Sequence, residues 1–446
     1  MLPITFFKVI QRILMKYKII VMFIALTPLF VNADEFSTLA EKENVFDHVV
    51  HHGWSSEKIP IALQVSGYIK AEAIFDSRQN FTERSGHYLY FPLEIRPDVL
   101  GNDINSRGDF DEYAIQSRLR VEGFGPDIGC MDSRSYIEGD FFGKTNATIA
   151  SFRLRHAYLT LESENFNFLA GQTWHPISIP IESPDTISFN TGAPLNPYSR
   201  NPQFRFTYHN DQIDIMVTAL GWIGDRPFGP LGPDSKYFRD AIMPDINVQA
   251  RFKWNEDNYI GAGFDVMRIV PRLATNLNYK EIQPFTSLAA TAYTKFSSHH
   301  LILYCKGAYV ENAVMWNMIG GYGIHTLNPA SDIRTYTPLR TAAFWAELIF
   351  DGSIEPALFI GFAKNLGAKK SIIHLEDEQS LYGIGTNINT VFRVAPRVRW
   401  YIKSLVLGTE IEYTRATYGI PDNFGRVKNT IPVGNVRFLL ATYYIF

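Results

Sequence analysis

The sequence contains only two cysteines in 446 residues, Cys130 and Cys305. Two cysteines cannot build a disulfide framework, and because they lie far apart in the sequence we expect two free thiols. Beyond the first 33 residues the chain also lacks any run of 18 apolar residues, so no later segment can cross a membrane as a helix. Any membrane insertion would therefore have to use strands closed into a barrel.

The chain also lacks a surplus of positive charge and the short motifs of common enzymes. Its formal net charge is −3 at pH 7, which argues against nucleic acid as a partner. No G-x-S-x-G, H-E-x-x-H or P-loop pattern occurs in it. We therefore expect no catalytic residue, no metal site and no cofactor.

Aromatic residues, in contrast, are abundant. They make up 14% of the chain, whereas the mean hydropathy is only −0.08. A helical membrane protein would be far more hydrophobic, and a disordered chain would be poorer in aromatic residues. The composition favours a folded protein rich in strands.

The N-terminus has the pattern of a secretory signal. A basic segment precedes the short apolar run 19–30, and the small residues Val31 and Ala33 follow it. This pattern predicts cleavage after Ala33, because a run of about 12 apolar residues is shorter than the roughly 20 that a spanning helix needs. Cleavage would remove four of the 42 basic residues and none of the 45 acidic ones, leaving a net charge of −7. The four are Lys8, Arg12, Lys16 and Lys18.

We expect three segments in the chain. These are a signal peptide at 1–33, a short periplasmic segment at 34–60 and a transmembrane β-barrel at 61–446. The segment 34–60 either forms a short helix or is a disordered leader. Met15 is as good a start codon as Met1, so the sequence leaves the true start open.

Apolar and polar residues alternate with period two from residue 63 onward. The stretches 64–73 and 246–254 show this most clearly. Segments of about ten residues with one apolar and one polar face are typical of transmembrane strands, although soluble β-sandwiches alternate too. We count sixteen such segments: 63–77, 112–124, 132–142, 149–161, 165–173, 202–210, 211–223, 245–254, 257–268, 286–297, 300–312, 340–350, 355–364, 390–402, 404–418 and 434–446.

The lengths of the connections separate a membrane barrel from a soluble sandwich. Connections after odd-numbered strands are long, except 143–148, and those after even-numbered strands are short, with 125–131 the longest. An even number of strands joined alternately by short turns and long loops indicates a bacterial outer-membrane barrel with its N-terminus in the periplasm. The long connections are 78–111, 174–201, 224–244, 269–285, 313–339, 365–389 and 419–433.

Short segments from one end of this region to the other also occur in a recognisable order. They are Gly67-Tyr68-Ile69-Lys70, Asp76-Ser77-Arg78, Ser117-Arg118-Leu119, Glu138-Gly139-Asp140-Phe141-Phe142-Gly143, Leu154-Arg155-His156-Ala157-Tyr158, Ala170-Gly171-Gln172-Thr173-Trp174, Lys364-Asn365-Leu366-Gly367-Ala368, Val394-Ala395-Pro396-Arg397, Glu412-Tyr413-Thr414-Arg415 and Asn435-Val436-Arg437. In order and spacing they resemble the DcaP-like trimeric porin family. The resemblance implies a sixteen-stranded barrel, usually a homotrimer, that passes small and often anionic solutes. Residues 34–60 are too few for the longer periplasmic coiled coil of that family.

The strand phase predicts which charged residues point into the lumen. Fifteen are basic and ten are acidic, although the mature chain is negative overall, and such an excess favours anions. The alternative is that each inward charge pairs across strands, as Arg120 with Glu138 or Arg399 with Glu410. The basic positions are Lys70, Arg118, Arg120, Arg134, Arg153, Arg155, Arg205, Arg251, Lys253, Lys295, Lys306, Arg393, Arg397, Arg399 and Arg437, and the acidic ones are Glu72, Asp76, Glu122, Glu138, Asp140, Asp214, Asp265, Glu347, Glu410 and Glu412.

The connection 174–201 is the candidate constriction loop. It holds five prolines, which restrict its flexibility. Its charged residues Glu182, Asp185 and Arg200 would set a transverse field against Arg153, Arg155 and Arg205. The alternative is a surface loop that packs at the axis of a trimer.

The last segment predicts how the barrel closes. Val436, Phe438, Leu440, Thr442, Tyr444 and Phe446 share one outward face. We expect this strand to pair with 63–77, and Phe446 to act as a signal for barrel-assembly machinery.

The predicted function is an outer-membrane porin for passive or solute-selective diffusion of small hydrophilic solutes, with a preference for anionic ones, through an arginine-rich lumen. Its expected partners are outer-membrane lipid and two further copies of the chain. The alternatives are an adhesin or plugged structural barrel and, less favoured, an outer-membrane hydrolase. The sequence names neither the solute nor the pore size.

Overall fold

The computed structural model describes residues 61–143, 145–178, 183–190, 192–223, 228–375 and 378–446. The chain divides into two units, Met1–Val45 and Phe46–Phe446, and all described residues belong to the second. The expected signal peptide and the segment 34–60 lie outside the described residues. Within the described residues, no helix is long and apolar enough to span a membrane.

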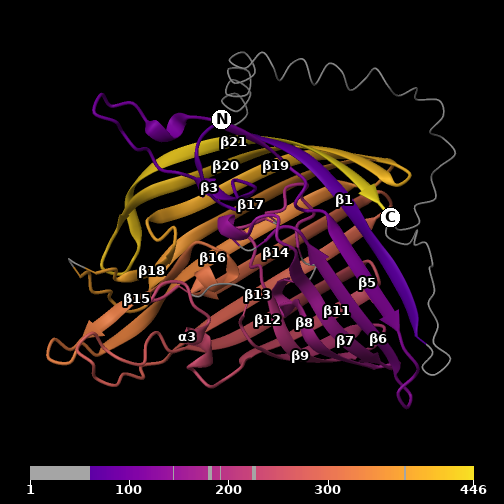
Figure 1. Ribbon diagram of the computed structural model, residues 1–446, viewed down its shortest axis with the longest axis horizontal. Coiled ribbons are helices and arrows are strands. Elements are labelled where there is room, and N and C mark those ends of the chain that lie inside the picture. The colour runs from indigo at the N-terminus through magenta and orange to yellow at the C-terminus, as the bar shows by residue number, and fades with distance from the viewer. Residues whose placement is uncertain (1–60, 144, 179–182, 191, 224–227, 376–377) are drawn as a thin grey trace. The chain divides into compact units, whose positions relative to one another are not determined.

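Sixteen antiparallel strand positions pair edge to edge and close into a barrel, as predicted (Figure 1). β4 and β5 occupy one position, because both pair with β1. Around the wall the strands are β1 (Ala62–Asp76), β4 (Asp109–Tyr113) with β5 (Arg118–Phe124), β6 (Asp132–Asp140), β7 (Arg153–Glu162), β8 (Phe166–Trp174), β9 (Arg200–His209), β10 (Ile213–Leu220), β11 (Asp245–Asn255), β12 (Asn258–Ile269), β13 (Phe285–Ser298), β14 (Leu301–Glu311), β16 (Arg334–Phe350), β17 (Ile354–Ala368), β19 (Ile388–Ile402), β20 (Leu405–Pro421) and β21 (Val427–Ile445).

The last strand closes the barrel against the first, as the sequence predicts. β21 pairs with β1 from Tyr68 opposite Ile445 to Asp76 opposite Arg437. Phe446 adds two backbone hydrogen bonds to Gly67, of 2.8 and 3.0 Å. A Cβ at Gly67 would lie 2.3 Å from the carbonyl oxygen of Arg118, so this close approach of strands requires glycine.

The wall has its apolar face outside and its charged face inside. In β1, Ile69 is 58% exposed, whereas its neighbour Lys70 is fully buried on the inner side. This reverses the polarity of a soluble protein and is expected where hydrocarbon surrounds the wall. Other exposed outer residues are Ile137, Leu159, Phe204, Phe206, Val217, Val248, Trp254, Phe264, Phe296, Phe344, Phe362 and Leu407.

The connections are short at one end of the barrel and mostly long at the other. We call these the tight-turn end and the long-loop end. The prediction of a long loop at 419–433 is wrong, because β20 and β21 continue to Pro421 and Val427 and only residues 422–426 join them. Tyr418 pairs with Ile431, and Ile420 pairs with Lys428, so an extended ladder replaces the loop.

The other long connections contain structure that the sequence analysis did not predict. β2 (Asn80–Glu83) and β3 (Tyr88–Pro92) form a hairpin, and β15 (Gly320–Leu327) joins β16 to β18 (Leu381–Ile384). Short helices are η3 (Ile104–Ser106), η4 (Asn146–Thr148), η5 (Pro176–Ser178), α3 (Lys236–Arg239) and η7 (Ala313–Trp316).

Several of these connections pack together inside the barrel. Tyr88, Phe189, Trp222 and Trp316 come from four different connections, and each is at most 5% exposed. They form one apolar cluster with inward wall residues such as Trp345. The lumen therefore holds an apolar core at the long-loop end. Cys130 and Cys305 are free thiols, as expected.

Candidate functional site in the barrel lumen

The described parts of the connection between β8 and β9 (175–178, 183–190 and 192–199) fold into the lumen rather than over the surface. The connection leaves the wall at β8, yet its backbone reaches strands on the opposite side of the barrel. Ile187 N donates to Glu410 Oε2 at 2.7 Å, and Lys70 Nζ donates to Ile187 O at 2.9 Å. Asn190 Nδ2 also donates to Glu412 Oε2 at 2.8 Å. We call this segment the inward loop.

Asp185 is the inward-loop carboxylate that faces the wall arginines. Its side chain accepts hydrogen bonds from Arg399 and, at 3.2 Å, from Arg397. It does not face Arg153, Arg155 and Arg205 as the sequence analysis expected. Asp185 keeps 54% of its side chain exposed, so the pair is accessible from one side. Glu182 lies outside the described residues.

A second set of arginines is held by wall carboxylates. Arg153 Nε donates to Asp140 at 2.6 Å and Arg155 Nε to Glu138 at 2.5 Å. Glu138 also lies within 3.3 Å of both Arg118 and Arg120, which confirms the predicted Arg120 pair. The predicted Arg399–Glu410 pair is wrong, because Glu410 lies opposite Arg397 in the ladder and accepts from the inward loop.

The remaining predicted lining residues also lie on the inner wall. Arg393 is 3.1 Å from Glu412 and donates to Ala193 O of the inward loop at 2.6 Å. Arg251 pairs with Asp214, and Arg205 donates to Trp174 O at 2.6 Å. The inward placement follows from strand phase, but their role as pore-lining residues stays a prediction. Of the predicted set, Arg134 is exposed near the tight-turn end.

The β2–β3 hairpin fills the lumen beside the inward loop. His87 Nε2 lies 2.5 Å from Glu72 Oε1, and Arg437 donates to the carbonyl oxygens of Gly86 and His87 at 2.8 Å each. Arg393 reaches the same hairpin through Tyr90 O at 3.1 Å. Inner-wall charges therefore satisfy backbone groups of two inserted segments.

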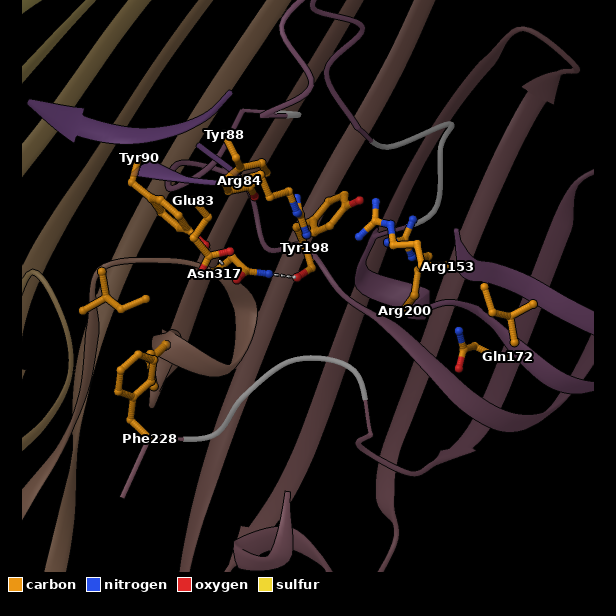
Figure 2. A pocket seen from close by; sticks show the side chains of 13 residues that line it. Glu83, Arg84, Tyr88, Tyr90, Arg153, Gln172, Tyr198, Arg200, Phe228 and Asn317 are labelled. Carbon is orange, nitrogen blue, oxygen red and sulfur yellow. Dashed lines mark hydrogen bonds between the residues drawn. The ribbon is translucent and has the colours of Figure 1, made fainter. Parts of the chain in front are cut away.

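Three arginines converge on a small cavity of about 80 Å³ at the long-loop end. Figure 2 shows Arg84 on one side of the Tyr198 ring and Arg153 with Arg200 on the other. Arg153 is paired with Asp140. Within the described residues, Arg84 and Arg200 lie within 4.0 Å of no carboxylate oxygen, and Arg84 Nε and Arg200 Nη1 are buried without a hydrogen-bond partner. We call Arg84, Arg153 and Arg200 the arginine cluster.

A larger cavity of about 420 Å³ lies towards the tight-turn end. It is bounded by the inner faces of β7 to β13 and carries charge of both signs. Arg205, Arg251 and Lys253 line it together with Glu162 and Asp214.

Sequence reasoning missed Arg84 and His87, because both lie in a connection taken as a plain loop. The signal was the run His87-Tyr88-Leu89-Tyr90-Phe91. A run of four aromatic rings and a leucine is unusual for a solvated loop, and in the structure each of these five residues is at most 4% exposed.

No family model matches the chain, and no curated protein matches it either. Solved structures do match. The outer-membrane channel DcaP of Acinetobacter baumannii has a TM-score of 0.64 and 17% identity, over 88% of this chain and 99% of that one. The anion-selective porin of Comamonas acidovorans has a TM-score of 0.50 and 9% identity, over 86% and 100% of the two chains. OmpT of Vibrio cholerae, in a trimer form, has a TM-score of 0.50 and 10% identity, over 86% and 99%.

These similarities show the fold. The chain has the barrel fold of outer-membrane channels, with the DcaP channel among its structural neighbours. This agrees with the family that the sequence segments resemble. At these identities the similarity carries no residue roles from one protein to another.

Proposed function

We propose that this protein is a porin-like channel of an outer membrane that passes small hydrophilic solutes and prefers anions. The observation that carries the proposal is the reversed polarity of the wall, together with an arginine cluster in which Arg84 and Arg200 have no carboxylate partner among the described residues. An apolar exterior suits lipid, and a charged interior suits a hydrated solute.

The preference for anions rests on the arginines that carboxylates leave uncompensated. Paired arginines such as Arg153 and Arg155 contribute little net field, because a carboxylate neutralises each. Arg84 and Arg200 add positive charge where protein walls limit screening, and this raises the local concentration of anions. Guanidinium groups also match the planar oxygens of carboxylate and phosphate.

The inward loop would act as the constriction. It is tied to β1, β16 and β20 by Lys70, Glu347 and Glu410. Its prolines and wall contacts restrict the motion of the parts of the loop that the structure describes. Solutes would pass beside it, where Asp185 is exposed next to Arg397.

Ion selectivity tests this proposal. Purified folded protein in planar bilayers is expected to conduct, with a reversal potential in a salt gradient that shows anion preference. Replacing Arg84 and Arg200 together by glutamine should move this potential towards zero, more strongly at low ionic strength. Arg134→Gln is the matched control, because Arg134 lies exposed near the other end. Cation selectivity, or equal shifts in the control and the double variant, would contradict the proposal.

The apolar core in the lumen favours a second candidate, a barrel plugged by its own connections. Tyr88 and Trp316 are at most 2% exposed inside the wall, and the cavity beside them is only about 80 Å³. A plugged barrel would give no steady conductance in the bilayer experiment until the hairpin is removed. That result would favour a structural or binding role.

Assembly as a homotrimer and insertion by barrel-assembly machinery are part of the same proposal. The exposed apolar wall offers area for contacts with lipid and with other copies of the chain. Cross-linking in native membranes would test the trimer, and a ladder without a trimer band would contradict it.

A further inference from the structure

Two carboxylates and one imidazole meet inside the barrel where the inward loop begins. His175 follows β8, Asp245 begins β11, and Asp265 lies in β12. All three side chains are at most 1% exposed. His175 Nε2 lies 3.3 Å from Asp265 Oδ2 and 3.6 Å from Asp245 Oδ2.

Among the described residues, no lysine or arginine neutralises the two carboxylates. In the part of the chain that the structure describes, neither aspartate has a lysine or arginine nitrogen within 4.0 Å. One histidine supplies at most one positive charge. Because buried charge is costly unless it is paired or bound to a metal, a further cation bound at this group would lower that cost.

The spacing of the three side chains fits a coordination shell. His175 Nε2 is near both carboxylates, yet it makes no hydrogen bond to either among the described residues, and Asp245 Oδ1 has no partner there. One ligand atom from each residue lies within 4.8 Å of the others. Tetrahedral bonds of about 2.1 Å, as zinc makes to nitrogen and oxygen, would place ligand atoms about 3.4 Å apart.

Neighbouring groups orient the carboxylates. Trp222 Nε1 donates to Asp245 Oδ2 at 2.7 Å, and Asn247 Nδ2 donates to Asp265 Oδ2 at 3.1 Å. Such outer contacts are typical supports of metal-binding residues. The rings of Trp222 and Trp316 pack against His175, with centroids 6.1 and 4.5 Å away.

His175 also links the group to the inward loop. Ile177 N donates to His175 Nδ1 at 3.2 Å, which directs Nε2 at the carboxylates. A metal bound at Nε2 moves the ring proton to Nδ1, so this contact must be exchanged and η5 must shift. Occupancy would therefore act on the first turn of the inward loop.

We propose that His175, Asp245 and Asp265 bind one divalent transition-metal ion of the zinc type. One imidazole nitrogen and two carboxylates suit zinc, whereas calcium takes six to eight oxygen ligands. The ion clamps the start of the inward loop to β11 and β12. This site is separate from the arginine cluster, and the proposal does not depend on the direction of ion selectivity.

Zinc binding to the purified, untagged, folded protein tests the site. After chelator treatment, equilibrium dialysis against zinc chloride with elemental analysis should find one ion per chain. His175→Ala and Asp265→Asn should each weaken binding by more than about tenfold. The matched controls are His300→Ala and Asp257→Asn, which change exposed residues in tight turns, and these should bind as the wild type does.

Two further measurements keep the test decisive. Heat-modifiable migration on gels selects folded protein for every variant. Cobalt added to the wild type should give the visible absorption of a low-symmetry, four-coordinate site, which needs no substitution. Folded wild type that retains no zinc, or variants that retain as much as it does, would overturn the proposal. The three side chains could instead be neutralised by a proton. In that case the exposure of the inward loop in the wild type would depend on pH but not on zinc, and this result would overturn the proposal too.

Discussion

Arg393 shows how the inner-wall charges of this barrel are used. It is fully buried, and its guanidinium donates to Thr414, to Ala193 O of the inward loop and to Tyr90 O of the hairpin. A buried guanidinium is tolerated only when its donors are satisfied. Arg393 therefore holds inserted segments in place, and a count of inward arginines overstates the charge that a solute meets.

Phe446 is expected to act in assembly. Its backbone makes both hydrogen bonds to Gly67 that complete the β1–β21 seam, and its side chain is 41% exposed on the outer face. Deleting Phe446 should lower the folded yield in the membrane while the molecules that assemble keep their conductance. Heat-modifiable gel migration measures the yield, with Phe446→Tyr as the control that keeps the seam and an aromatic ring. Equal yields with and without Phe446 would count against this role.

Among the elements, the β2–β3 hairpin is an inserted segment that occupies part of the lumen. Wall residues hold it through Glu72, Arg437 and Tyr418, the last donating to Pro92 O at 2.6 Å. Its aromatic side chains belong to the apolar cluster. It behaves as part of the lumen and not as a surface loop.

Replacing residues 80–92 by a short flexible linker is expected to raise single-channel conductance. The change removes Arg84 as well, so anion preference should fall at the same time. Planar-bilayer recording measures both. The control is a variant in which the exposed connection near Leu100, which is 83% exposed, is shortened by the same number of residues. Unchanged conductance in the hairpin variant would mean that the hairpin does not limit flow.

A network of charges joins three connections at the long-loop end. Asp332 accepts from Arg272 at 3.0 Å and from Arg334 at 2.7 Å, and Arg334 reaches Glu378 at 2.7 Å. Burial alone would raise the pKa of Asp332, but hydrogen bonds from Arg272, the backbone of Asn276 and Arg334 outweigh it and hold that pKa below its ordinary value.

This network predicts loops that loosen in acid. Because the pKa of Asp332 is lower in the folded protein than in the unfolded chain, its ionised form stabilises the fold. This stabilisation is complete above the unfolded pKa of about 3.9 and is lost as pH falls through the lower folded pKa. Limited cleavage by an acid-active protease should therefore increase across this range in the wild type. In Asp332→Asn the connections should be cleaved at every pH tested. Cleavage of the wild type that does not change with pH would contradict this.

For the whole molecule, the reversed polarity of the wall sets where charge is tolerated. Phe204 and Phe206 stand 66% and 48% exposed in the middle of β9, while Arg205 between them is buried inside. Lipid or a neighbouring copy must cover such a surface in the assembled state.

Phe204→Arg should destabilise the folded barrel by about 2–4 kcal/mol, the cost of arginine near the middle of a bilayer. Urea unfolding in lipid vesicles measures the change. Leu100→Arg, in an exposed connection, is the control and should have little effect. Equal stability of the two variants would contradict a membrane-facing wall.

Strand number, strand phase and closure followed from the sequence, because each is set by a local pattern. Alternation with period two names the inward face of a strand wherever the strand lies, so Lys70, Arg205, Arg397 and Glu412 were placed correctly on the inner side. A long loop was wrongly predicted at 419–433 because this stretch is rich in polar residues and glycine, which the end of a long hairpin also tolerates.

Only the tertiary structure decided how the lumen is filled and which charges stay uncompensated. Asp185 meets Arg399, and His175 meets Asp245 and Asp265, across gaps of many residues. Such contacts depend on how a connection crosses the barrel, and strand periodicity carries no information about that path. The strands of the wall could be predicted because their pattern is local in the sequence. The packing of the segments inside the lumen could not, because it depends on contacts between residues far apart in the chain.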